Sequence, residues 1–574
     1  MEKRILMAFA LSFLVFTLYL RFFSPTPRQP LEPPAAGVED VQPPPPALPA
    51  PLPQAGVGIP EGPPSATPTA LTEELRQDTV ERTIEVDTPL YHAVFENRGA
   101  KLKSFVLKEY TDESGRPFEM VPIEASERLG TVPLELELED PAWTAAVENA
   151  LFEASASQLD LTASESGEMI FDWANGQGLS VRKKLGFSGD SYRLQVEVSV
   201  QRAGNELGKK ILYGPGVGEA FREGTYVQPD RGVIAAGGEL EFFSADDIEE
   251  AEGAAVGVQL VGISAHYFAG LMVPTESGKY AASLGKESLE VGEENVRRRD
   301  FITAALEAPN APLLFTLYIG PKEQDRLAEL GPGIENVIDY GRWMRYLALP
   351  LRSALLWIHG YVGNYGWSIV LLTIAINVVL IPLKHHSYVS MRKMQELAPT
   401  IKRIQERYKK LKPTDPRRQE MNKEVYALYR EHHVSPLSGC LPMLLMIPFF
   451  FAFYRLLMVS IELRHAPFML WIQDLSSFDP FFVLPILMGV SQIAIQKMSP
   501  QTSADPVQAK VMMFMPVVFV FILAWAPSGL VLYWFVNNLV SLVQQSVTNR
   551  LRNSESTGGK KTKKGSGQPK NVEA

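Results

Sequence analysis

The stretch WSIVLLTIAINVVLIPL, residues 367–383, is almost wholly apolar, and its length approaches the ~20 residues that cross a bilayer as a helix. Asn377 lies near its middle, and Thr373 lies one helical turn earlier on the same face. An unpaired amide is costly in lipid, so these residues either hydrogen-bond between helices or line a polar site. The stretch therefore predicts a membrane protein with a polar feature inside one span.

Apolar residues are unevenly distributed along the 574-residue chain. They concentrate at the N-terminus and in the C-terminal third, whereas the middle is acidic and polar. This pattern predicts a membrane protein that carries a large soluble domain. The formal net charge of −10 averages over compartments and says little about partners. The single cysteine, Cys440, begins an apolar span, where packing is favoured over a catalytic role.

The N-terminal segment, residues 1–23, predicts a transmembrane anchor. Lys3 and Arg4 precede an uncharged run, Ile5–Leu20, and no small-residue cleavage site follows it. The next segment, residues 24–78, is rich in proline and predicts a stiff, disordered periplasmic tether.

Residues 79–335 alternate between apolar and polar side chains in short runs. Examples are RTIEVDT (82–88), SYRLQVEVSV (191–200) and PLLFTLYIG (312–320). A period of two predicts half-buried strands, and their number predicts a large all-β sandwich domain. The glycine-rich runs between them lack the spacing of phosphate-binding loops and are interpreted as turns.

Residues 336–362 are predicted to hold an amphipathic interfacial helix. Its apolar stripe consists of Leu347, Leu351, Leu355 and Ile358. Trp343 and Trp357 suit the headgroup boundary, so we expect this helix to lie on the membrane surface. Packing against the soluble domain is the alternative.

The core, residues 363–550, contains five further apolar spans. They are residues 366–383, 436–458, 481–496, 511–526 and 529–547. The third and fourth are short, which predicts local bilayer thinning. With the anchor, the fold class is an α-helical polytopic membrane protein of six spans.

Basic residues orient these spans. The segment 384–435 holds 13 Lys and Arg against 6 acidic residues, and residues 550–574 hold 7 against 2. Positive charge favours the cytoplasm. We therefore expect both termini and the basic tail, residues 551–574, in the cytoplasm and the β domain outside the cytoplasm, which is the periplasm in a bacterium with two membranes.

The segment 384–435 is predicted to form a cytoplasmic helical hairpin with a basic exterior. Asp415 suits a cap of its second helix, and Pro399 is expected to bend or restart the first. The candidate contact residues are Arg392, Lys393, Lys402, Arg403, Arg407, Arg417 and Arg418. They form either a solvated face or a contact surface for ribosomal RNA or anionic lipid.

The sequence carries little that suggests an enzyme. His385, His386, His432 and His433 flank the hairpin, but no further ligand completes a metal set, and interfacial polar residues are the better interpretation. No nucleophile–base pair or phosphate loop is recognisable. We expect no bound metal, no cofactor and no bond chemistry.

Several stretches together resemble the membrane core of the YidC/Oxa family of bacterial inner-membrane protein insertases. They include DYGRW (339–343), WIHGYVGNYGWSIVLLT (357–373), PLSGCLPMLLMIPFFFAFYRLL (436–457), ELRHAPFMLWIQDLS (462–476) and APSGLVLYWFVNNLV (526–540). The resemblance spans about residues 339–550, and the N-terminal half resembles the long Gram-negative form. It implies a five-helix insertase core around a hydrophilic groove. It also implies insertion of nascent membrane proteins, alone or with the Sec translocon and its accessory subunits.

One position departs from the family pattern. Alignment through IPL (381–383) puts Asn377 where bacterial members usually carry a groove arginine. The nearest basic residue, Lys384, is two turns away, so the sequence predicts a groove without a fixed charge. The residues expected to line it are Thr373, Asn377, Tyr533, Asn537 and Asn538. Hydrogen bonding between helices is their alternative role.

Nine of the 18 methionines lie within residues 443–515. Flexible thioethers suit contact with many sequences, although they also fill cores. The candidates for an apolar substrate-contacting surface are Met443, Met446, Met512, Met513 and Met515. The competing function is a transporter or channel, which would require ionisable residues deep in several spans.

Overall fold

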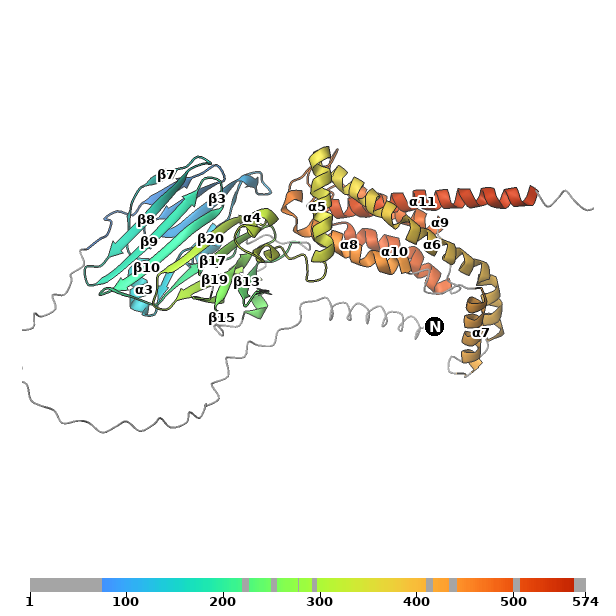
Figure 1. The fold of residues 1–574 in the computed structure, drawn as a ribbon, viewed down its shortest axis with the longest axis horizontal. Coiled ribbons are helices and arrows are strands. Elements are labelled where there is room, and N and C mark those ends of the chain that lie inside the picture. Colours follow the sequence, from blue (N-terminus) through green and yellow to red (C-terminus); the bar gives the residue numbers. More distant parts are fainter. Residues whose placement is uncertain are drawn as a thin grey trace, which may run out of the picture.

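The computed structural model describes most of the chain beyond the predicted anchor and tether. The described residues are 75–218, 227–248, 255–276, 278–291, 297–408, 415, 417–432, 441–498 and 506–561. The predicted anchor (1–23), most of the tether and the end of the tail lie outside them. A β-sheet part is joined to a group of long helices (Figure 1).

The β-sheet part contains three sheets. One five-stranded sheet has the order β4 (Pro117–Glu119), β3 (Lys101–Thr111), β2 (Tyr91–Glu96), β1 (Thr83–Asp87) and β7 (Gln158–Asp160). The other has the order β15 (Ala255–Val256), β18 (Ala281–Val291), β19 (Arg297–Ala308), β12 (Lys209–Tyr213) and β5 (Leu136–Leu138).

The third sheet has ten strands. Its path is β14 (Glu239–Phe243), β13 (Arg231–Ala236), β16 (Val258–Ser264), β17 (Phe268–Pro274), β20 (Leu313–Pro321), β10 (Arg193–Arg202), β9 (Leu179–Ser188), β8 (Ser166–Ala174) and β6 (Glu153–Ala154), with β11 (Asn205–Glu206) beside β10. Apart from β1 with β7, the pairings of the described strands are antiparallel. Short helices lie at α2 (Ile123–Leu129), α3 (Pro141–Glu148), α4 (Gln324–Ala328), η1 (Ala245–Asp247) and η2 (Ile334–Val337).

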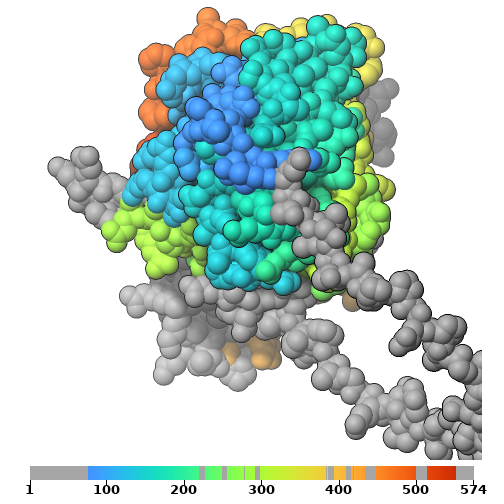
Figure 2. All heavy atoms as spheres, turned by 90° about the vertical axis from the view of Figure 1, so that its left-hand side faces the viewer, coloured from blue at the N-terminus to red at the C-terminus, as the bar shows by residue number. Residues whose placement is uncertain are grey.

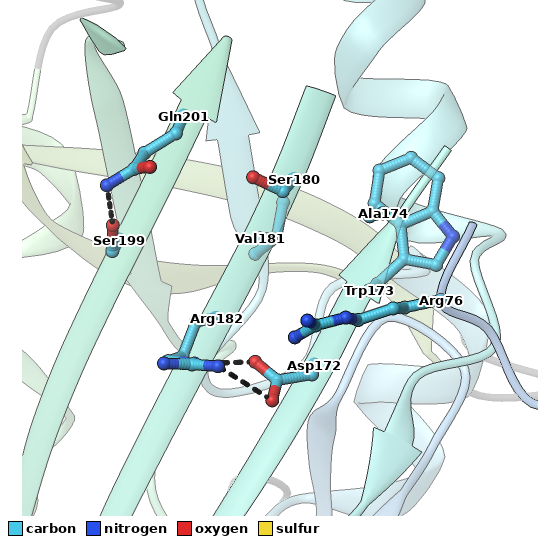
Figure 3. Close-up of a pocket in the computed structure, with 9 residues that line it drawn as sticks. All are labelled: Arg76, Asp172, Trp173, Ala174, Ser180, Val181, Arg182, Ser199 and Gln201. Carbon is cyan, nitrogen blue, oxygen red and sulfur yellow. Dashed lines mark hydrogen bonds and ion pairs between the residues drawn. The ribbon is translucent and has the colours of Figure 1, made fainter. Parts of the chain in front are cut away.

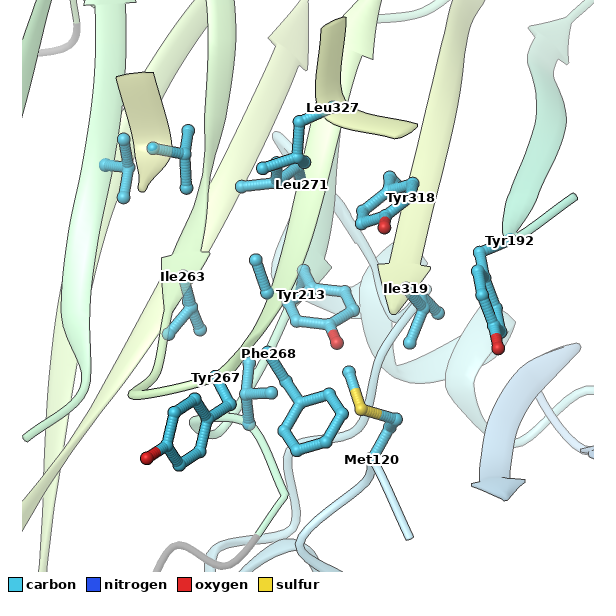
Figure 4. Close-up of a cluster of buried hydrophobic side chains, with 14 of the residues drawn as sticks. Met120, Tyr192, Tyr213, Ile263, Tyr267, Phe268, Leu271, Tyr318, Ile319 and Leu327 are labelled. Atoms are coloured by element: carbon cyan, nitrogen blue, oxygen red, sulfur yellow. The ribbon is translucent and has the colours of Figure 1, made fainter. Parts of the chain in front are cut away.

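The ten-stranded sheet packs against both smaller sheets. Phe95 of β2 contacts Phe171 of β8, with ring centroids 6.1 Å apart. On the other side of the core, a Cβ on Gly270 of β17 would overlap the ring of Tyr213 of β12, so only glycine fits there. Figure 4 shows Tyr213 and Phe268 within this buried cluster. The prediction of a large domain built mostly of β sheet is confirmed.

The described chain begins on the face of the β-sheet part that Figure 2 presents. Its first residues, in blue, lie beside the teal atoms of residues near 200. Backbone hydrogen bonds between Arg76 and Ala174 join the start of the described chain to β8 of the large sheet.

The helical part follows the predicted spans. Its helices are α5 (Arg345–Val362), α6 (Tyr365–Arg407), α7 (Arg417–Glu431), α8 (Leu441–Val459), η3 (Ile461–Leu463), α9 (Val483–Met498), α10 (Pro506–Leu523) and α11 (Ser528–Lys561). Among the described residues, only the window Tyr365–Pro382 is both long and apolar enough to cross a membrane. Three shorter apolar helices cover Pro448–Val459, Val483–Met498 and Met513–Leu523. Six spans therefore stay a prediction.

The expectation at Pro399 is a bend or a restart of the first helix. A restart does not occur, because α6 runs as one helix from the apolar span to Arg407. Glu424 of α7 accepts hydrogen bonds from Arg407 Nη2 and from the Tyr408 hydroxyl, each at 3.0 Å. Asp415 accepts from the backbone N–H of Arg417 at 3.0 Å, as predicted for a residue capping the second helix.

A carboxylate joins the two parts of the molecule. Asp339 Oδ2 accepts from both Nη atoms of Arg231 of β13 at 3.1 Å and from Arg455 Nη2 of α8 at 2.9 Å. Burial alone would raise the pKa of Asp339, but the two guanidinium groups outweigh it and hold that pKa below its ordinary value. Nearby, His266 Nε2 lies 2.7 Å from the carbonyl oxygen of Met458 near the end of α8.

Candidate functional site

Helix α6 presents two different faces. Thr373 and Asn377 lie on a buried stripe that includes Ile369 and Leu372. The opposite side exposes apolar side chains, among them Trp367, Leu371, Ile374, Val378 and Val379. The helix begins at Asn364, whose side chain accepts from the backbone N–H of Trp367 at 3.0 Å. The polar residues of the span thus face protein, and the apolar residues face outward.

The polar stripe forms a chain of hydrogen bonds. Thr373 Oγ1 donates to the carbonyl oxygen of Ile369 at 2.6 Å, and Asn377 Nδ2 donates to that of Thr373 at 2.8 Å. Lys384 Nζ then donates to Asn377 Oδ1 at 2.6 Å. The expectation that no positive charge reaches Asn377 is therefore wrong.

Helix geometry explains this contact. Seven residues bring the chain back to nearly the same face, about 20° away. They also separate Lys384 from Asn377 by about 10 Å along the axis. Side chains on a helix tilt toward its N-terminus, so the long side chain of Lys384 extends back along the helix to the side-chain amide of Asn377. Backbone separation alone does not reveal this contact, because the direction of the lysine side chain decides it.

The residues predicted on α11 make different contacts. Asn538 Nδ2 donates to Ser491 Oγ at 3.0 Å and to the carbonyl oxygen of Met488 at 3.3 Å, joining α11 to α9. The ring of Tyr533 stacks on Phe453 of α8 with centroids 4.4 Å apart. Asn537 Oδ1 is buried and has no hydrogen-bond partner within the part of the chain that the structure describes.

Asn537 lies at nearly the same depth as Asn377. A Cβ on Gly529, near the start of α11, would lie 3.5 Å from Ile369 Cδ1 of α6. Both helices run away from α5 (Figure 1), and each asparagine comes eight positions after this contact. At 1.5 Å per residue, both lie about 12 Å further along. An acceptor that has no partner among the described residues and a lysine amine thus lie at the same depth in the helical part.

The predicted apolar and basic surfaces are only partly described. Met513 and Met515 of α10 are 60% and 43% exposed, beside exposed Phe514. Met443, Met446 and Met512 belong to α8 and α10, but their side chains lie outside the described residues.

Of the hairpin residues, five have exposed side chains: Lys393, Lys402, Arg403, Arg407 and Arg417. The side chains of Arg392 and Arg418 are outside the description. Arg407 pairs with Glu424 and Arg417 pairs with Asp415, each at 3.0 Å.

A pocket that no sequence motif indicates lies on the β-sheet part, between β8, β9 and β10. Figure 3 shows Arg182 of β9 donating to both carboxylate oxygens of Asp172 of β8, at 2.6 and 3.1 Å, with Arg76 and Trp173 beside them. Its nine lining residues include no histidine and no cysteine. Across the described ranges, no group of three or more His, Cys, Asp or Glu side chains is arranged to hold a metal ion.

Comparison with known proteins assigns the family. The model of the 60Kd inner membrane protein matches residues 357–556, and that of the YidC periplasmic domain matches residues 83–354. The membrane protein insertase YidC of Geobacter sp. (strain M21) is 37% identical over 484 residues, covering 82% of this chain and 86% of that protein. Its counterpart from Geobacter sulfurreducens is 35% identical over 561 residues, covering 96% and 98%.

A solved structure described as an active YidC insertase with its first transmembrane domain resolved is 19% identical. It covers 83% of this chain and 95% of its own, with a TM-score of 0.34. The assignment rests on the family models and the sequence relatives. By both, the chain belongs to the YidC family, whose named relatives are membrane protein insertases.

Proposed function

We propose that this chain inserts newly made proteins into the inner membrane through a hydrated groove beside α6 and α11. The single observation that carries the proposal is the Lys384–Asn377–Thr373 chain of polar contacts on the buried face of an apolar helix. The buried Oδ1 of Asn537, at the same depth, supports it, because an acceptor without a protein partner is a site for water.

The physical role of such a groove is to lower a partitioning barrier. A charged residue costs about 2.5–3.5 kcal/mol at the bilayer centre on insertion scales, and a client must carry several polar groups across. A wet notch open to lipid shortens the apolar distance. Burial of the client's own apolar helix then drives insertion, and no bond is made or broken.

The short apolar helices support a second contribution. The apolar helix Val483–Met498 would span about 24 Å at 1.5 Å per residue, against about 30 Å for a bilayer core. Adjacent lipid would thin to match it. The exposed Met513 and Met515 suit a surface that accepts many client sequences.

The charges support the remaining arrangement. In this proposal the chain has six spans, with both termini in the cytoplasm and the β domain in the periplasm. Nascent membrane proteins are the clients, alone or beside the Sec translocon and its accessory subunits. The exposed basic side chains of α6 and α7 contact ribosomal RNA or anionic lipid.

Depletion of the protein tests the proposal. We expect a small two-span client to lose insertion on depletion, measured as protease protection of its periplasmic loop. Asn377→Leu should reduce insertion, whereas Ile374→Leu, on the exposed face of the same helix, should leave it unchanged. Normal insertion during depletion, with loss of a solute flux, would instead indicate a transporter.

A further inference from the structure

Lys384 lies on the inner face of α6. Its seven-residue spacing from Asn377 continues the buried stripe that contains Thr373 and Ile369. Its own side chain is partly buried, whereas its neighbour His385 is exposed. Lys384 therefore belongs to the polar chain between the helices and not to the basic exterior of the hairpin.

The side chain points away from the end of the span. A lysine at the edge of a membrane helix ordinarily extends its amine outward to water and headgroups. Lys384 extends in the opposite direction, and its Nζ lies 2.6 Å from Asn377 Oδ1. This inward position costs solvation, so a specific polar contact and water in the groove must hold it there.

The amine has unused bonding capacity. An ammonium group has three donors, and one of them meets Asn377. Among the described residues, no carboxylate lies within ion-pair distance of Lys384. A cation without an anionic partner in a partly desolvated site is a binding point for a carboxylate from outside the chain.

We infer that Lys384, positioned by Asn377, supplies the positive charge of the groove and selects clients whose translocated segment carries Asp or Glu. This inference rests on the proposed function and names the specificity of the same site. Asn377 acts on clients through Lys384 and through hydration, so its loss affects more clients than the loss of the lysine does.

The test compares two clients in proteoliposomes that contain the full chain. The clients are identical except that the translocated tail carries aspartates in one and asparagines in the other. We expect Lys384→Met to lower the insertion rate of the aspartate client by about tenfold, at the lower end of measured couplings between close charges. The insertion rate of the asparagine client should change by less than about twofold, which is within the effect of a surface substitution.

Matched variants separate charge from structure. Lys497→Met, an exposed lysine in the last turn of α9, should leave the insertion rates of both clients unchanged. Lys384→Arg should retain the preference for the acidic client. If Lys384→Met unfolds the chain, the double variant Asn377→Arg with Lys384→Gln restores a cation from the other position, and it should recover selective insertion of the aspartate client.

Equal effects of Lys384→Met on both clients, or no effect on either, would overturn the inference. The proposed function fails in a different way. In that case the unaltered chain inserts neither client, whatever residue occupies position 384.

Discussion

Asp339 joins the β-sheet part to the helices, and Asp339→Asn tests how strongly it does so. The carboxylate accepts three hydrogen bonds from Arg231 and Arg455, and the three side chains are 18%, 22% and 29% exposed, respectively. An asparagine keeps the shape, but it removes the charge and places its amide donor against either the guanidinium groups or the backbone N–H of Gly341.

The expected cost follows from burial. Breaking a fully buried ion pair costs about 3–5 kcal/mol, and partial exposure of all three groups reduces this to about 2–3 kcal/mol. At 1.4 kcal/mol per factor of ten, opening of this junction should become about 30- to 150-fold more frequent. Hydrogen exchange of the segment 334–345 in the full-length protein in detergent measures that change.

The control is Asp172→Asn, because its partner Arg182 is 58% exposed and such a pair contributes less than about 1 kcal/mol. The pKa of Asp339 is lowered from its ordinary 3.8, so its contribution is present above that pH and is lost as the pH falls through the folded-state pKa. The protection of 334–345 against exchange, relative to the intrinsic exchange rate at each pH, should therefore fall in acid in the unaltered chain and not in the variant. Exchange in Asp339→Asn within about twofold of the unaltered chain would refute the argument.

Three other substitutions test separate contacts. Asn538→Leu removes the hydrogen bond to Ser491 and should lower stability in detergent by about 0.6–1.7 kcal/mol, measured by unfolding in denaturant; no change would mean that the bond contributes nothing. Lys183→Met leaves three carbonyl oxygens without their donor and should cost about 1–3 kcal/mol. Burial lowers the pKa of Lys183 to about 7, whereas the lysine of the unfolded chain keeps its proton until about pH 10.5. The free energy of unfolding should therefore rise with pH between these two values, and it should rise less in the variant. Gly366→Ala would push a methyl group into the ring of Phe468. The unfolding temperature should fall, at a cost of about 1–3 kcal/mol in the free energy of unfolding. An unchanged temperature would show that the loop carrying Phe468 moves aside without cost.

The strands and helices were predictable because periodicity reports them directly. The runs at 191–200 and 312–320 became β10 and β20, and the apolar span at 366–383 became the first half of α6. The strand order could not be predicted, because strands far apart in sequence pair here, such as β12 with β5. The alternation of apolar and polar residues within a strand does not specify which other strand it pairs with.

The candidate site was predictable as a position but not as a set of contacts. Depth and helix phase identified Thr373 and Asn377, since both depend only on spacing. The role of Lys384 depends on the direction of one side chain, and that of Asn538 depends on which helix lies opposite. Neither is a property of spacing alone.

Because α6 is unbroken, the positions of two distant surfaces around its axis depend on each other. The helix carries Asn377 in the candidate groove and Arg407 against α7 on the same backbone. One inserted or deleted residue between them would turn one surface relative to the other by about 100° and shift it by about 1.5 Å. The intervening segment therefore tolerates substitutions of side chains far better than changes in length, and the groove and the hairpin keep a fixed angular register.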